Sequence, residues 1–166
     1  MEQNTNTKET AYLASGCFWG TQYHLNKLEG VEATYVGYMG GHVENPTYPE
    51  VKTGTTGHVE TVKVVFDPAK VDFEQLIRLY FEIHDFTQED GQGPDIGSQY
   101  LSVIFYTNER QKEIAEKYVG ILTEKGYEVA TSVKPASAFW MGEDYHQHYY
   151  DNRGERPYCH MYKKIF

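Results

Sequence analysis

The spacing of apolar residues divides the chain into short strands and amphipathic helices. Apolar and β-branched runs predict strands over residues 9–15, 31–38, 59–66, 99–106 and 128–133. Apolar positions at helical spacing predict helices over residues 18–28, 73–84 and 109–125. Asp72 and Asn108 are suited to cap the second and third helices, and Gly30 and Gly126 to end the first and third.

The order of these elements indicates the fold class. The first six elements run strand, helix, strand, strand, helix, strand, which matches a split βαβ arrangement. We therefore expect an α+β, two-layer sandwich with a ferredoxin-like mixed sheet, an added helix and strand, and an irregular C-terminal tail. One short helix is expected over residues 143–150. Residues 1–166 contain no repeat or linker and are predicted to form a single domain, with residues 1–10 as a flexible tail.

Two segments rich in glycine and proline, residues 39–57 and 85–97, are predicted to be long loops. Loops of that length in a compact domain are usually functional or mobile. No Gly-x-Gly-x-x-Gly motif opens a helix and no phosphate-binding loop lysine is present, so a nucleotide is not expected.

Charge and composition narrow the possible partners. The net charge of −9 disfavours binding to nucleic acid or to an anionic membrane surface, and no apolar run is long enough to span a bilayer. The only cysteines are Cys17 and Cys159, which excludes a zinc site built mainly from cysteine. We expect a cytoplasmic monomer without cofactor or metal.

Cys17 is placed between a strand and the first turn of a helix. The amide groups at a helix N-terminus stabilise an anion, so this position would lower the thiol pKa and activate the sulfur as a nucleophile. A buried and inert cysteine is the alternative. Phe18 and Trp19 are either core residues or a hydrophobic wall for a substrate.

Glu60 lies on the apolar face of the predicted strand over residues 59–66. Side chains alternate along a strand, so Glu60 shares a face with Val62, Val64 and Phe66. Burial raises a carboxyl pKa and makes the group a proton donor near neutral pH. The alternative is that Glu60, at the strand end, turns into solvent.

The predicted loops and the C-terminal region contain polar groups that could bind a ligand. Tyrosine hydroxyls in the loops can polarise a substrate oxygen, although most tyrosines are structural. His146 and His148 are two residues apart, a spacing that would place them on different sides of a helix. A metal site at these histidines is therefore disfavoured.

Six segments together resemble the A-type methionine sulfoxide reductases. They are residues 16–20 (Gly-Cys-Phe-Trp-Gly), 37–41 (Gly-Tyr-Met-Gly-Gly), 45–48 (Asn-Pro-Thr-Tyr), 56–60 (Thr-Gly-His-Val-Glu), 92–100 (Gln-Gly-Pro-Asp-Ile-Gly-Ser-Gln-Tyr) and 143–147 (Glu-Asp-Tyr-His-Gln). The resemblance extends from about Ala11 to Cys159. Lys52 and Ser98 depart from it, because some relatives have cysteine and threonine there.

The resemblance implies reduction of methionine-S-sulfoxide, free or in proteins, and it implies a role for each site residue. Cys17 would attack the sulfoxide sulfur and Glu60 would protonate the oxygen. Cys159 would then resolve the Cys17 sulfenic acid as a disulfide that thioredoxin reduces. The resemblance also implies residues that bind the substrate. An exposed pair, Phe18 and Trp19, would hold the methyl group, and Tyr48 and Tyr100 would hydrogen-bond the oxygen. Asp95 would support the polar network around that oxygen.

Two alternatives remain open at this point. A cysteine hydrolase would use His58 or His42 to activate Cys17 and Asp95 to orient that histidine. A non-catalytic redox switch would only form a disulfide between Cys17 and Cys159.

Overall fold

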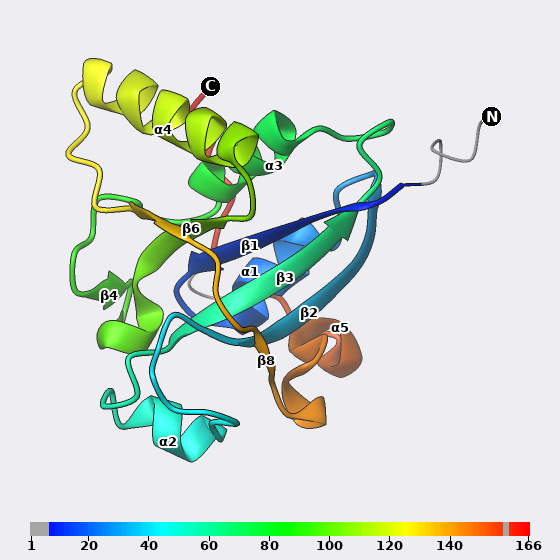
Figure 1. Cartoon of the computed structure of the whole chain (residues 1–166), viewed down its shortest axis with the longest axis vertical. Coiled ribbons are helices and arrows are strands. Elements are labelled where there is room, and N and C mark those ends of the chain that lie inside the picture. Colours follow the sequence, from blue (N-terminus) through cyan, green and yellow to red (C-terminus); the bar gives the residue numbers. More distant parts are fainter. Residues whose placement is uncertain (1–6, 158–159) are drawn as a thin grey trace.

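A six-stranded mixed sheet forms the centre of the computed structural model, which describes residues 7–157 and 160–166 (Figure 1). Its strands are β1 (Glu9–Ser15), β2 (Val31–Met39), β3 (Val59–Phe66), β6 (Ser102–Tyr106), β7 (Ser132–Pro135) and β8 (Trp140–Met141). They lie in the order β7-β6-β1-β3-β2-β8, and only the β6–β7 pair is parallel.

Two split βαβ units interleave in this sheet. The helix α1 (Phe18–Leu25) connects β1 to β2, and β3 pairs between those two strands. The helix α3 (Phe73–Glu82) connects β3 to β6, and β1 pairs between them. The third long helix, α4 (Glu109–Glu124), leads to the added edge strand β7. The predicted α+β class and split βαβ core are therefore confirmed.

Side-chain alternation gives the sheet two different faces. Val62, Val64 and Ile104 join the main core beneath α1, α3 and α4. Val103 and Phe105 point the other way, into a smaller cluster with Phe139. In Figure 1 the connection from β7 to β8 crosses this second face, so the chain covers both sides of the sheet.

The predicted helix starts are confirmed by their caps. Asp72 accepts a hydrogen bond from the Gln75 amide, and Asn108 accepts one from the Gln111 amide. The end of α3 falls at Glu82, so His84 lies beyond the helix in which it was predicted.

Several boundaries differ from the sequence-based prediction. The predicted 39–57 loop contains a short helix, α2 (Tyr48–Lys52), which starts because Thr47 and Glu50 form a capping box. Instead of one helix over 143–150 there is a 3₁₀ turn (Asp144–His146) followed by α5 (Tyr149–Arg153), since His148 adopts a left-handed conformation between them.

The remaining corrections concern strands. The β7 strand covers residues 132–135 rather than 128–133, β6 begins at Ser102, and β8 was not predicted. Pairing with distant neighbours decides these edges, and such pairing has no local signal. The first two residues of β1, Glu9 and Thr10, belong to the predicted tail but pair with β3. No helix in the described ranges is both long and apolar enough to cross a membrane.

Candidate active site

Cys17 occupies the N-cap position of α1, between β1 and the first turn of the helix, as the sequence predicts. The strand β1 ends at Ser15, and Gly16 turns the chain with a φ of 96° that favours glycine. A side chain at Gly16 would also collide with Gln92, because an added Cβ would lie 2.5 Å from the Gln92 Cβ. Cys17 is only 8% exposed and is therefore largely buried.

Glu60 lies beside the first turn of α1 and is 2% exposed. Its Oε1 accepts a hydrogen bond from the Phe18 amide, at 3.1 Å. Burial and, to a smaller extent, the charge of Asp95 raise the Glu60 pKa, the Phe18 amide lowers it, and the net value is about 8. The prediction of a buried carboxyl is confirmed, and the solvent-facing alternative is wrong.

Tyr48 and Tyr100 come from different segments of the chain, and their side chains interact. Tyr48 is the first residue of α2, and Tyr100 ends a 3₁₀ turn over Ser98–Tyr100. Burial, together with the charges of Glu60 and Cys17, raises the pKa of Tyr48 to about 12 and also raises the pKa of Tyr100. Both hydroxyls are therefore protonated donors near Cys17 and Glu60 at neutral pH.

Asp95 lies in a two-strand hairpin formed by β4 (Gly91–Gln92) and β5 (Asp95–Ile96). Its charge raises the pKa of both Glu60 and Tyr100. Asp95 is thus close enough to act on the same polar cluster. The structure brings Cys17, Glu60, Tyr48, Tyr100 and Asp95 together from five separate segments of the chain.

Phe18 and Trp19 have different surroundings. Phe18 is buried in the main core, where its ring packs against Tyr38 and His146 with centroid distances of 5.7 and 5.2 Å. Trp19 is half-buried and stacks on Tyr149, with ring centroids 3.6 Å apart. The expectation of an exposed aromatic pair is therefore wrong for Phe18, because this residue on α1 points into the core.

Two further residues, Glu143 and His146, support the site without an assigned role from the sequence. Glu143 accepts hydrogen bonds from the Tyr38 hydroxyl at 2.7 Å and from the Tyr48 amide at 2.8 Å. Burial alone would raise the Glu143 pKa, but these two hydrogen bonds keep that pKa below its ordinary value. Glu143 therefore fixes the start of α2 and with it the Tyr48 hydroxyl.

His146 holds the indole of Trp19 in place. Its Nδ1 accepts a hydrogen bond from the Trp19 indole N–H at 2.9 Å, and its ring packs edge-on against Tyr48 at 4.4 Å. Burial lowers the His146 pKa, so the ring is neutral and its proton is on Nε2. The segment 143–147 was part of the family resemblance, but only the folded structure shows what these two side chains contact.

His58, one of the two histidines that the hydrolase alternative could use, is engaged elsewhere. His58 accepts a hydrogen bond from the Gly41 amide on Nδ1 and donates from Nε2 to the Val43 carbonyl. Both ring nitrogens therefore stabilise the loop rather than Cys17. The described residues also contain no group of three or more histidine, cysteine and acidic side chains arranged for a metal ion. Cys159 lies outside the described residues.

In this fold and site a buried cysteine lies beside a buried carboxylic acid. Comparison with known families agrees with this chemistry, because the family model described as peptide methionine sulfoxide reductase matches residues 9–166. The chain therefore belongs to the peptide methionine sulfoxide reductase family, an oxidoreductase family whose similar members are of the MsrA type.

Individual relatives and structures agree. The peptide methionine sulfoxide reductase MsrA of Sulfolobus acidocaldarius is 45% identical over 154 residues, which cover 92% of this chain and 88% of the relative. The reduced form of Mxr1 from Saccharomyces cerevisiae has a similar structure, with a TM-score of 0.87, 30% identity and coverage of 94% and 92% of the two chains. Mxr1 in complex with Trx2 matches with a TM-score of 0.63 at 21% identity, over 94% of this chain and 90% of Mxr1.

Proposed function

We propose that this chain reduces the S epimer of methionine sulfoxide, free or in proteins, with Cys17 as the nucleophile. The observation that carries the proposal is the buried Glu60 carboxyl, whose pKa of about 8 keeps it protonated at neutral pH beside the first turn of α1. A sulfoxide oxygen needs a proton as its bond to sulfur breaks, and a positioned acid supplies it.

In the first step, the Cys17 sulfur attacks the sulfoxide sulfur. Glu60 protonates the oxygen, and the hydroxyls of Tyr48 and Tyr100 donate hydrogen bonds that stabilise the developing negative charge. The oxygen passes to Cys17, so the substrate sulfur is reduced by two electrons and the Cys17 sulfur is oxidised to a sulfenic acid. Cys17 reacts as a thiolate whose proton has gone to solvent, and Glu60 takes a proton back from solvent as methionine leaves.

Substrate binding follows from the surroundings of Cys17. We propose that the half-buried Trp19 provides the main wall for the methyl group of the substrate, with Phe18 as the packed residue behind it. The bond from Trp19 to His146 fixes the plane of the indole. Asp95 supports the polar cluster through its charge, which raises the Glu60 pKa.

In the second step, the thiol of Cys159 attacks the Cys17 sulfenic acid. A disulfide forms and water leaves, so the oxygen of the sulfoxide ends in water. Thioredoxin then reduces the disulfide by thiol exchange. The complex of Mxr1 with Trx2 supports this choice of reductant by analogy.

The proposed cycle requires no cofactor or metal, because both electron pairs move between sulfur atoms. We further propose a single-domain monomer in the cytoplasm, where reduced thioredoxin keeps protein thiols reduced. The net charge of −9 supports independence from nucleic acid and from anionic membranes.

An assay of the two sulfoxide epimers tests the proposal. Purified protein is incubated with dithiothreitol and either methionine-S-sulfoxide or methionine-R-sulfoxide, and methionine is quantified by chromatography. We expect turnover of the S epimer only. Turnover of the R epimer, or oxidation of Cys17 without repeated methionine release, would contradict it, and the second result would favour the redox switch.

A further inference from the structure

Tyr145 is an exposed aromatic residue that lies next to the candidate active site. It is 63% exposed, the largest value among the aromatic residues that the structure describes. Its ring nevertheless packs on that of His146, with centroids 4.1 Å apart. His146 in turn packs on Tyr48 at 4.4 Å and accepts a hydrogen bond from Trp19. Tyr145 is therefore separated by a single ring from two residues that we propose bind the sulfoxide.

Electrostatics also place the Tyr145 side chain close to the hydroxyls of the site. Burial is the largest cause of the raised pKa values of Tyr38 and Tyr48, and the charge of Tyr145 is a smaller cause of both. The effect of one charge on another weakens with distance and with exposure to water, so an exposed side chain acts only on near neighbours. The ring of Tyr145 thus borders the site on the side of Tyr48.

The turn that carries Tyr145 is held in place by a neighbouring side chain. Tyr145 is the middle residue of the 3₁₀ turn Asp144–His146. The Gln147 Nε2 donates hydrogen bonds to the carbonyls of Val36 at 2.9 Å and Gly142 at 3.1 Å, and its Oε1 accepts one from the Val36 amide at 2.9 Å. The Gln147 side chain thus pairs with β2 as a peptide group would. Because the turn is fixed and tyrosine has only two side-chain torsions, the exposed ring loses little conformational entropy when it binds a partner.

The substrate-binding residues proposed above all act on the sulfoxide group itself. Trp19 would contact the methyl group, and Tyr48 and Tyr100 would contact the oxygen. The methionine side chain is short, so the main chain of a polypeptide substrate lies just outside the site once the sulfur has reached Cys17. Successive residues of an extended polypeptide are about 3.3 to 3.6 Å apart. The side chain next to the oxidised methionine therefore falls on the rim that Tyr145 forms, whereas free methionine sulfoxide has no such neighbour.

We propose that Tyr145 is a specificity-determining residue, which binds an apolar side chain next to the oxidised methionine of a polypeptide substrate. The inference rests on the proposed function and names the substrate class that the same site favours. An exposed aromatic ring gains most from a partner that covers its apolar face, and a leucine-sized side chain does so. The contact lies outside the reacting atoms, so it increases the affinity for the polypeptide and leaves the chemistry at Cys17 as described.

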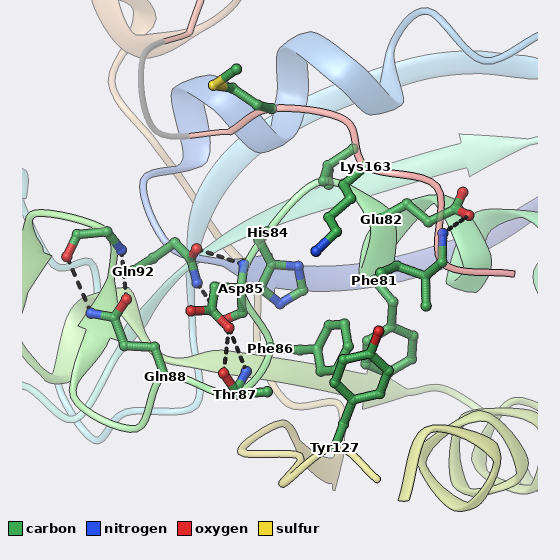
Figure 2. A pocket seen from close by; sticks show the side chains of 14 residues that line it. Phe81, Glu82, His84, Asp85, Phe86, Thr87, Gln88, Gln92, Tyr127 and Lys163 are labelled. Carbon is green, nitrogen blue, oxygen red and sulfur yellow. Dashed lines mark hydrogen bonds between the residues drawn. The ribbon is translucent and has the colours of Figure 1, made fainter. Parts of the chain in front are cut away.

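A pocket elsewhere on the molecule is the other place where a polypeptide could be bound. It has a volume of about 550 Å³ at the end of α3, and Figure 2 shows Phe86, Tyr127 and Lys163 around it. The described residues that line this pocket include neither Tyr48 nor Tyr145. Binding there would not depend on the Tyr145 ring, so a variant of the pocket wall distinguishes the two places.

Steady-state kinetics of the full-length protein with dithiothreitol test the role of Tyr145. The substrates are free methionine-S-sulfoxide, a blocked pentapeptide with leucine on both sides of the methionine-S-sulfoxide, and the same peptide with glycine in place of leucine. Wild type should have a higher kcat/KM for the leucine peptide than for the glycine peptide, mainly through a lower KM. In Tyr145→Ala the ratio of kcat/KM for the leucine peptide to that for the free amino acid should fall about tenfold.

Three control variants accompany this comparison. Tyr145→Phe keeps the ring and should keep the wild-type ratio. Tyr35→Ala removes another exposed tyrosine, 37% exposed on β2, and should also leave the ratio unchanged. Lys163→Ala changes the wall of the pocket in Figure 2 and should behave in the same way.

Several results would overturn the proposal. An equal fall of kcat/KM for all substrates in Tyr145→Ala would mean that Tyr145 only supports His146. An unchanged ratio in Tyr145→Ala, or the same loss in Tyr145→Phe, would exclude the ring contact, and a loss in Lys163→Ala alone would place the polypeptide at the pocket. Equal kcat/KM of wild type for the leucine and glycine peptides would overturn it without any variant. A wild-type protein that reduces none of the substrates would instead identify a failure of the proposed function.

Discussion

Replacing Glu60 with glutamine should make the protein more stable and much less active. In the folded protein burial raises the Glu60 pKa from 4.5 to about 8. In the unfolded chain the group titrates near its ordinary value. Between these two pH values the folded protein binds a proton that the unfolded chain has lost, so the free energy of unfolding falls as pH rises. The stabilising contribution is complete below pH 4.5 and is lost as pH approaches 8.

The magnitude follows from the width of this window. Each pH unit between the two pKa values is worth about 1.4 kcal/mol. A pH of 7 lies about 2.5 units above the pKa of this carboxyl in the unfolded chain. The free energy of unfolding is therefore lower by roughly 3 kcal/mol than it would be with a neutral side chain. Glutamine has nearly the same shape and never ionises. We therefore expect the free energy of unfolding of Glu60→Gln to exceed that of wild type by about 3 kcal/mol at pH 7 and by little at pH 5.

Urea denaturation at pH 5, 6, 7 and 8, followed by far-UV circular dichroism, measures this difference. Other titrating groups are common to both proteins, so their contributions cancel when the two free energies are subtracted at each pH. A difference between variant and wild type that stays constant from pH 5 to pH 8 would refute a raised Glu60 pKa. The same result would remove the main support for Glu60 as a proton donor.

The same substitution, Glu60→Gln, should lower catalytic activity although it raises stability. Loss of a positioned general acid typically slows a reaction about 10²- to 10⁴-fold. Glutamine can still donate a hydrogen bond but cannot transfer a proton, so methionine formation in a single turnover should fall within that range. Wild type should also lose activity above about pH 8, as the carboxyl ionises, and the variant should lack this decline. Full activity in the variant would contradict the proposed role.

Three further predictions concern other residues. Cys17→Ser should form no methionine, whereas Cys159→Ser should form about one per enzyme and then stop with thioredoxin as reductant; sustained turnover of either variant would exclude that cysteine. Tyr48→Phe and Tyr100→Phe should each slow single-turnover methionine formation roughly 10- to 100-fold. Tyr35→Phe is the control, because Tyr35 is exposed. An unchanged rate in the double variant would exclude a catalytic role for both hydroxyls. His84 is buried and its pKa is lowered to about 3, so its contribution to stability is complete above pH 6.5 and is lost toward pH 3. Wild type should therefore lose about 1.4 kcal/mol per pH unit relative to His84→Asn between pH 6 and 4, measured by urea denaturation, and parallel profiles would refute this.

The sequence predicted the parts of this protein that depend on local rules. Strand alternation placed Glu60 on the buried face of β3, and the structure confirms the burial. Capping residues predicted the starts of α3 and α4, where Asp72 and Asn108 accept the expected hydrogen bonds. The position of Cys17 at the start of α1 also follows from a local signal, a strand broken by Gly16.

The sequence could not predict contacts between distant segments. Glu143 is 95 residues from Tyr48, and His146 is 127 residues from Trp19, yet each pair is hydrogen-bonded. Such pairs form only when the long connection after β7 crosses the sheet and brings residues 143–146 to α1 and α2. His160 is a similar case, because neither its burial nor its contact with the Ser15 carbonyl has a signal in the surrounding residues.

The contact between α1 and Glu60 explains how the same acid can both hold and release its proton. Burial favours the neutral carboxyl, which is the form that the first step needs. Once the proton has moved to the sulfoxide oxygen, the product is a buried carboxylate that would be costly without a partner. The Phe18 amide already donates a hydrogen bond to the Glu60 Oε1 and lies at the positive end of the helix. In the proposed mechanism the first turn of α1 therefore stabilises two anions in sequence, the Cys17 thiolate before proton transfer and the Glu60 carboxylate after it.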